Sequence, residues 1–124
     1  MEPLIRSEIL DGVGIITLDR PQQFNSLSLA MHRQMTAALT ALEQDAEVRC
    51  LMIQAEGKHF CTGADLREVT GLRNSAPALE LFLATGLETF RRLEQSPLPV
   101  VVAVQGLALA GGLELVLACD VALA

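Results

Sequence analysis

Residues 59–65 and 108–114 are the two glycine-containing segments whose composition and spacing could support chemistry. Each directly follows a short apolar run typical of a β-strand, and ligands of open α/β folds gather outside such strand ends. Glycine lets the backbone approach a ligand closely. Gly111 stands at the expected start of a helix, where amide groups are free and the helix dipole is positive. Two backbone donors, one from each segment, could stabilise a developing oxyanion, and one such donor is typically worth about 3 kcal/mol.

Glu114 is the candidate acid or base. It is the only charged residue between Gln95 and Asp120, and a lone carboxylate in so apolar a segment needs a cavity or hydrogen bonds. Positions i and i+3 share one face of a helix, so its carboxylate could reach whatever Gly111 holds. Together, these features indicate a site for an anion or a carbonyl group.

The same residues also have purely structural explanations. Gly63 and the Gly111-Gly112 pair could simply mark turns. Glu114 could complement the dipole at the start of its helix. Asp65 is more typical of a helix cap than of a catalytic acid. The two segments alone therefore do not decide between a site and ordinary loops.

The composition describes one apolar domain, residues 1–124. A chain of 124 residues fits one domain. Hydrophobic residues make up 51% and the mean hydropathy is +0.39, so exposed apolar surface could be covered by a partner. The net charge is −6, without a run of Lys or Arg and without Trp or Tyr. Nucleic acids and anionic membranes attract basic patches, so we expect neither as a partner.

The cysteines Cys50, Cys61 and Cys119 are an odd number without paired spacing. They are typical of reduced thiols in an intracellular protein. No signal peptide is visible at the N-terminus. Residues 96–113 are uncharged over the length of a membrane span, but their prolines and glycines argue against a transmembrane helix. The sequence predicts a cytoplasmic protein and indicates no metal site.

Hydrophobic periodicity places these residues on an alternating set of elements. The predicted strands span residues 4–10, 13–18, 49–55, 99–105 and 120–124, and the predicted helices span residues 28–45, 64–69, 75–96 and 111–119. Asp11-Gly12 is typical of a hairpin turn, and Ser28 of a helix N-cap. Because strands alternate with helices, the predicted fold class is α/β.

Two packing expectations follow. The helix over residues 75–96 has an apolar stripe of Leu79, Phe82, Leu83, Leu87, Phe90 and Leu93. The run over residues 99–105 is continuous and β-branched, so both faces of that strand should be covered, as in a sheet packed by helices.

Three segments closely resemble the enoyl-CoA hydratase/isomerase (crotonase-like) family. They are RPQQFNSLS at residues 20–28, KHFCTGADL at residues 58–66 and LPVVVAVQGLALAGGLELVLACDVALA at residues 98–124. The segments occur in the family's order with family-like spacing, and the resemblance covers residues 5–124. It implies a crotonase-like α/β spiral of ββα units that is incomplete at the C-terminus.

By position, the resemblance implies that the amides of Ala64 and Gly111 form an oxyanion hole. Glu114 would match the first of two catalytic glutamates that add water across the 2,3 double bond of an enoyl thioester. One glutamate positions and deprotonates water while the other handles the proton at carbon 2, so the chemistry needs a base and an acid.

The resemblance also implies where coenzyme A would lie. Asp65, Leu66 and Arg67 would line the substrate-binding loop, and residues 20–27 would border the nucleotide part of coenzyme A. Lys58 or Arg67 could meet its phosphates, since an acidic ligand needs local cations in a chain of net negative charge.

The implied function is that of an enoyl-CoA hydratase, a lyase of fatty acid metabolism that assembles as a homotrimer or hexamer. No cofactor is expected, because coenzyme A is part of the acyl-CoA substrate. The family also contains isomerases and other enolate-stabilising enzymes, which are the first alternative. Family members are longer, and their second catalytic glutamate lies past the position of Ala124. The second alternative is therefore an inactive fragment that acts as a binding or assembly partner.

Overall fold

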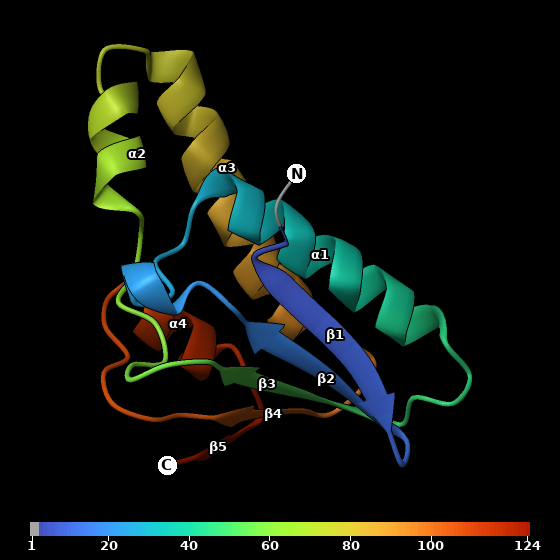
Figure 1. Cartoon of the computed structure of the whole chain (residues 1–124). Helices are drawn as coiled ribbons and strands as arrows, with labels where there is room; N and C mark the ends of the chain where they lie inside the picture. Colours follow the sequence, from blue (N-terminus) through green and yellow to red (C-terminus); the bar gives the residue numbers. More distant parts are fainter. Residues whose placement is uncertain (1–2) are drawn as a thin grey trace.

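A computed structural model describes residues 3–124 and confirms the predicted α/β class (Figure 1). Its strands are β1 (Ile5–Leu10), β2 (Val13–Leu18), β3 (Cys50–Ala55), β4 (Val100–Ala103) and β5 (Val121–Leu123). Its helices are α1 (Leu29–Gln44), α2 (Leu66–Leu72), α3 (Ala76–Glu94) and α4 (Gly111–Leu117), with a short 3₁₀ turn at Pro21–Gln23.

The strands form one mixed sheet in the order β1-β2-β3-β4-β5. β1 and β2 are antiparallel, and each later pair is parallel. Asp11 and Gly12 both have positive φ, 51° and 82°, as a type I′ hairpin turn requires. Because β2, β3 and β4 run in parallel, the segments that follow them leave the sheet at the same edge.

Helices α1 and α3 pack together over one face of this sheet (Figure 1). The side chains between them and the strands are fully buried and include Met35, Leu39, Leu51, Ile53 and Val100. Burial of one such side chain typically stabilises a fold by about 1.5–3 kcal/mol. This layer fixes the sheet edge at which the glycine-containing loops emerge.

The opposite face of the central strands is less covered than the sequence predicts. Val100 and Val102 of β4 are buried, but Val101 and Ala103 are only half-buried. The expectation that both faces of this strand are covered is therefore wrong for residues 3–124. The reason is that α1 and α3 lie on the same side of the sheet.

The predicted apolar stripe of α3 is also partly wrong. The residues that α3 buries are Phe82, Gly86, Thr89 and Leu93. Leu83 and Leu87 are 55% and 65% exposed. The helix is rotated so that its small and polar residues Gly86 and Thr89 face α1, and this rotation moves the two leucines out of the core.

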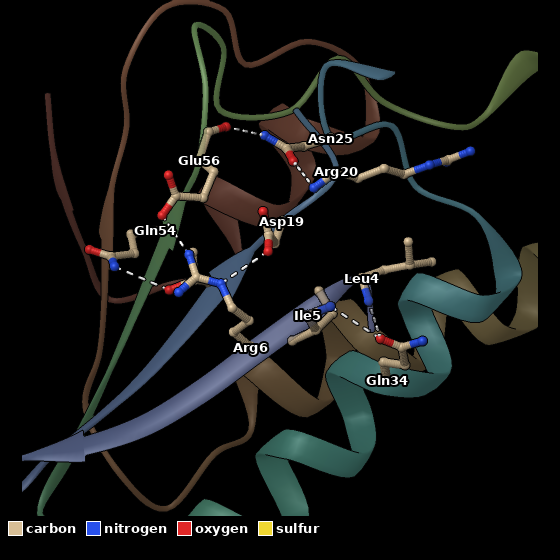
Figure 2. Close-up of polar contacts among 10 residues, drawn as sticks. Leu4, Ile5, Arg6, Asp19, Arg20, Asn25, Gln34, Gln54 and Glu56 are labelled. Carbon is tan, nitrogen blue, oxygen red and sulfur yellow. Dashed lines mark hydrogen bonds and ion pairs between the residues drawn. The ribbon is translucent and has the colours of Figure 1, made fainter. Parts of the chain in front are cut away.

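Polar contacts fasten the N-terminal strand to the rest of the domain (Figure 2). The Gln34 side-chain oxygen on α1 accepts hydrogen bonds from the amides of Leu4 and Ile5, at 2.7 and 3.1 Å. Arg6 on β1 pairs with Asp19 and Glu56, which follow β2 and β3. Exposed ion pairs of this kind contribute little, roughly 0–1 kcal/mol, so they mainly fix the position of the strand.

No helix among residues 3–124 is both long enough and apolar enough to cross a membrane.

Candidate active site

The two glycine-containing segments lie side by side, as the sequence predicts. Single-residue parallel bridges join Leu27 to Ala64 and Cys61 to Ala108. In the first bridge the Leu27 amide donates to the Gly63 carbonyl at 2.7 Å, and in the second the Leu109 amide donates to the Cys61 carbonyl at 3.0 Å. The loops after β2, β3 and β4 are thus held together by main-chain hydrogen bonds.

The amides of Ala64 and Gly111 both line one cavity of about 370 Å³. A methyl group built on Gly111 would lie 3.8 Å from the Ala64 nitrogen, and one built on Gly63 would lie 3.3 Å from the Gly111 nitrogen. Neither amide donates to a protein acceptor within residues 3–124. Two unpaired amide donors beside each other in a cavity form the arrangement that a carbonyl oxygen can accept from.

Backbone conformation at Ala110 orients the second of these amides. Ala110 has φ 49° and ψ −117°, a region that an L-residue adopts at a cost of about 1–3 kcal/mol. The peptide between Ala110 and Gly111 is turned by this conformation just before α4 begins. Alanine gives no sequence signal for positive φ, so the sequence does not indicate the role of this residue.

Glu114 lies in the first turn of α4 and lines the same cavity as Ala64 and Gly111. Its amide donates to the Ala110 carbonyl at 2.9 Å. Its carboxylate is exposed and has no side-chain hydrogen bond or ion pair within residues 3–124. The carboxylate is therefore free to act on a molecule bound in the cavity, while its position also complements the helix dipole.

Asp65 is a helix cap, which is one of the two roles that its sequence position allows. Its carboxylate caps α2, accepting from the amides of Arg67 and Glu68 at 3.0 and 3.3 Å, and pairs with Arg20 at 2.9 Å. Desolvation raises its pKa, but the hydrogen bonds and charge of Arg20 and the helix amides together bring this pKa below its usual value. Asp65 is thus an ionised cap that joins two loops.

Leu66 and Arg67 follow this cap at the exposed start of α2. Leu66 is 76% exposed. Arg67 is also exposed, and its guanidinium has no ion pair within residues 3–124. By contrast, Arg20 is committed to Asp65 and to the Ser26 carbonyl, at 2.9 and 3.0 Å. Of these two arginines, Arg67 is the one available to an anionic ligand.

Asn25 is a structural residue of the site that the sequence analysis did not identify. Its side chain is fully buried and its φ is 55°. Its side-chain oxygen accepts from the Arg20 amide at 2.8 Å, and its nitrogen donates to the Glu56 carbonyl at 2.8 Å (Figure 2). The same nitrogen also donates to the His59 carbonyl at 3.0 Å. An asparagine in a polar loop is ordinary in sequence, and only the fold shows that it ties together the segments after β2 and β3.

His32 on α1 is a second cavity residue that was missed, because it stands within an apolar helical pattern. It is 4% exposed and its Nδ1 lies 2.9 Å from the Thr89 hydroxyl on α3. Its ring packs edge-on against Phe82 and Phe90. Burial lowers the pKa of His32 to about 4, so the imidazole is neutral at neutral pH.

Cys61 and Cys119 are poor nucleophiles. Burial raises the pKa of Cys61 to about 11. Burial and the neighbouring charge of Asp120 raise the pKa of Cys119 to about 12. Among residues 3–124, no group of three or more His, Cys, Asp or Glu side chains could hold a metal ion.

The fold and the cavity define an α/β domain with paired backbone donors and a carboxylate at one sheet edge. Residues 8–124 match the family model described as enoyl-CoA hydratase/isomerase, and the chain belongs to that family.

Individual relatives and structures agree with this assignment. The chain is 36% identical over 112 residues to the "Probable enoyl-CoA hydratase" of Bacillus subtilis (strain 168), covering 90% of this chain and 43% of that protein. It is 36% identical over 129 residues to the "1,2-epoxyphenylacetyl-CoA isomerase" of Escherichia coli (strain K12), covering 100% of this chain and 48% of the relative. The crystal structure of an enoyl-CoA hydratase/isomerase from Xanthobacter autotrophicus Py2 superposes with a TM-score of 0.92 at 36% identity, covering 98% of this chain and 46% of that one. The crotonase-like fold predicted from sequence is confirmed, and the chain spans less than half the length of these relatives.

Proposed function

We propose that this chain supplies the thioester-binding loops and one catalytic glutamate of an enoyl-CoA hydratase, a lyase acting on 2-enoyl-CoA thioesters. The observation that carries the proposal is that Ala64 and Gly111, whose amides are unpaired, and Glu114 all line one cavity. The relative from Bacillus subtilis bears the name of such an enzyme. Coenzyme A enters as part of the substrate, and no separate cofactor is involved.

In this proposal the thioester carbonyl oxygen accepts hydrogen bonds from the amides of Ala64 and Gly111. Negative charge develops on that oxygen when a nucleophile adds at carbon 3, and preorganised donors stabilise the charge more in the transition state than in the substrate. Glu114 acts as general base and takes a proton from the attacking water. The proton added at carbon 2 requires an acid distinct from Glu114.

The exposed start of α2 is the proposed contact for coenzyme A. Leu66 offers apolar surface beside the oxyanion amides, and Arg67 offers a cation without an ion-pair partner among residues 3–124. Lys58 is exposed on the loop after β3 and adds a second cation. Phosphate groups are recognised by such charge-assisted contacts.

The proposal is tested by hydration of a short 2-enoyl-CoA by the product of the complete reading frame, followed as loss of the conjugated thioester absorbance. Removal of a general base typically lowers turnover by about 10²–10⁴-fold, and that loss is expected for Glu114→Gln. Glu80→Gln is the matched control, since Glu80 is an exposed carboxylate of α3. If the Glu114→Gln protein hydrates the substrate at the wild-type rate, Glu114 is not the general base.

Double-bond isomerisation is the alternative within the same site. The relative from Escherichia coli that matches the whole chain is named an isomerase of an epoxide thioester, so its name supports isomerisation in this family but not specifically that of a double bond. A single carboxylate beside an oxyanion hole can move a proton between two carbons of an enolate, without an added water. Product analysis with 2-enoyl and 3-enoyl thioesters separates the two reactions, because only hydration gives a hydroxyacyl product.

A binding or assembly role without turnover is the remaining alternative. Several leucines near the C-terminal end are exposed, among them Leu109, Leu113, Leu117 and Leu123, and contiguous apolar surface marks interaction sites. Tight coenzyme A binding without turnover would favour this role. A homotrimeric or hexameric assembly, a cytoplasmic location and a place in fatty acid metabolism stay predictions.

A further inference from the structure

His32 lines the cavity that Glu114 also lines, and it forms a buried polar pair with Thr89 behind it. The other residues of the cavity wall are mainly apolar, with Leu27, Phe82 and Phe90 among them. The pair is isolated from the ion pairs of the domain, and no step of the proposed hydration uses it. A polar group placed in an apolar cavity wall needs a hydrogen-bond partner to offset its lost hydration.

The hydrogen bonds of the pair favour one tautomer of the imidazole. The Thr89 hydroxyl donates to the Thr85 carbonyl at 3.2 Å, and it has only one proton to give. With that proton used on the Thr85 carbonyl, Nδ1–H donates to the hydroxyl oxygen across the 2.9 Å contact with His32. In the neutral ring Nε2 is then left as an acceptor.

Nε2 has no hydrogen-bond partner among residues 3–124. Among residues 3–124, no buried side-chain nitrogen or oxygen lacks a hydrogen-bond partner. Since no donor among these residues reaches Nε2, that nitrogen keeps some exposure, and the cavity lined by His32 supplies it.

Gly86 on α3 keeps this acceptor accessible. A methyl group at Gly86 would lie 3.2 Å from Nε2, inside ordinary van der Waals contact. Glycine in the interior of a helix is otherwise unfavourable by about 0.8–1 kcal/mol relative to alanine. The absence of a side chain at Gly86 thus leaves room for a ligand atom beside His32 Nε2.

We propose that His32 Nε2 is a specificity-determining acceptor that binds a hydroxyl or N–H donor on the acyl group of the substrate. This inference rests on the proposed function, because it takes the cavity to be the place where the acyl group lies. Leu83 and Leu87 contact the apolar part of that acyl group. Nε2 favours acyl groups that carry a hydrogen-bond donor at the matching position. A buried acceptor discriminates against a ligand that leaves it unpaired.

The test measures binding of saturated acyl-CoA thioesters, which cannot be hydrated, by calorimetry on the product of the complete reading frame. The thioesters form a length series in which each chain ends either in a hydroxyl or in a methyl of similar size. At the length that reaches Nε2, the wild type should bind the hydroxyl member about fivefold more tightly, the usual effect of one hydrogen bond. Gly86→Ala and His32→Leu should lose this preference and still bind the methyl member.

Gly71→Ala is the matched glycine control, because a methyl group on Gly71 of α2 meets no atom within 4 Å. It should keep the hydroxyl preference. The inference is overturned if the wild type shows no preference at any length, or if the preference survives in Gly86→Ala. Should none of the thioesters bind, the proposed function fails together with the inference. Binding without a preference removes the inference alone.

Discussion

A methyl group on Gly112 would lie 2.2 Å from the carbonyl oxygen of Cys61 and 2.8 Å from its carbonyl carbon. Helix α4 therefore begins in direct contact with the backbone of the loop after β3. The neighbouring Gly111 is different, because its nearest contact would be the Leu27 side chain at 3.4 Å. The two adjacent glycines thus have separate roles. Gly112 allows α4 to pack against the Cys61 backbone, whereas Gly111 places its amide beside that of Ala64.

This difference predicts opposite outcomes for two alanine substitutions. Gly112→Ala should lower the free energy of unfolding by several kcal/mol, since backbone atoms must move apart, and overpacking typically costs about 1–3 kcal/mol or more. Gly111→Ala should leave stability near the wild-type value but weaken acyl-CoA binding, because its methyl group would lie 3.8 Å from the Ala64 nitrogen. Urea denaturation followed by circular dichroism measures the first effect and calorimetry the second. Equal stability of the two variants would contradict the prediction.

Stability should depend on pH through His32. Burial lowers its folded-state pKa from 6.5 to about 4, so between these values the unfolded chain binds a proton that the folded chain does not. Its contribution is fully present above pH 6.5 and is lost as the pH falls towards 4, by up to about 3 kcal/mol. Urea midpoints between pH 7 and pH 4 measure the loss, and His32→Leu should flatten it. The Asp65 carboxyl contributes in a lower window, because its pKa lies below 3.8.

Asp65→Asn should destabilise the fold less than Asp65→Ala does. Asp65→Asn keeps an oxygen that can cap α2 but removes the charge that pairs with Arg20. Asp65→Ala removes both and should cost about 0.5–2 kcal/mol for the lost cap alone. Thermal unfolding should rank the wild type first, Asp65→Asn second and Asp65→Ala last. An alanine variant as stable as the asparagine variant would show that the cap contributes nothing.

The element pattern could be predicted because it depends on local periodicity. Strand alternation and helix capping placed both glycine-containing loops after strands, and parallel strand order brought them to one edge. The rotation of α3 could not be predicted, because it depends on which residues α1 presents to it. Hence Leu83 and Leu87 were assigned to the core, although Gly86 and Thr89 occupy that face.

Only some of the cavity residues could be predicted from the sequence, for a similar reason. Gly111 and Glu114 are recognisable because glycine and a lone carboxylate are unusual in an apolar segment. His32 and Ala110 gave no signal, since a histidine on a helix and an alanine in a loop are common. Their properties arise from long-range contacts, such as that between His32 and Thr89, which are 57 residues apart.

The bridges that join Leu27 to Ala64 and Cys61 to Ala108 consist of main-chain atoms. The donors at Ala64 and Gly111 are main-chain atoms as well. A point mutation changes a side chain and leaves every amide except proline's in place, so neither donor can be deleted by an ordinary substitution that preserves the backbone path. An engineer could therefore vary the side chain at Ala64 to reshape the cavity without removing the paired amides. In the proposed reaction, the same property leaves Glu114 as the residue at which a single mutation would lower turnover without removing the donors that bind the substrate.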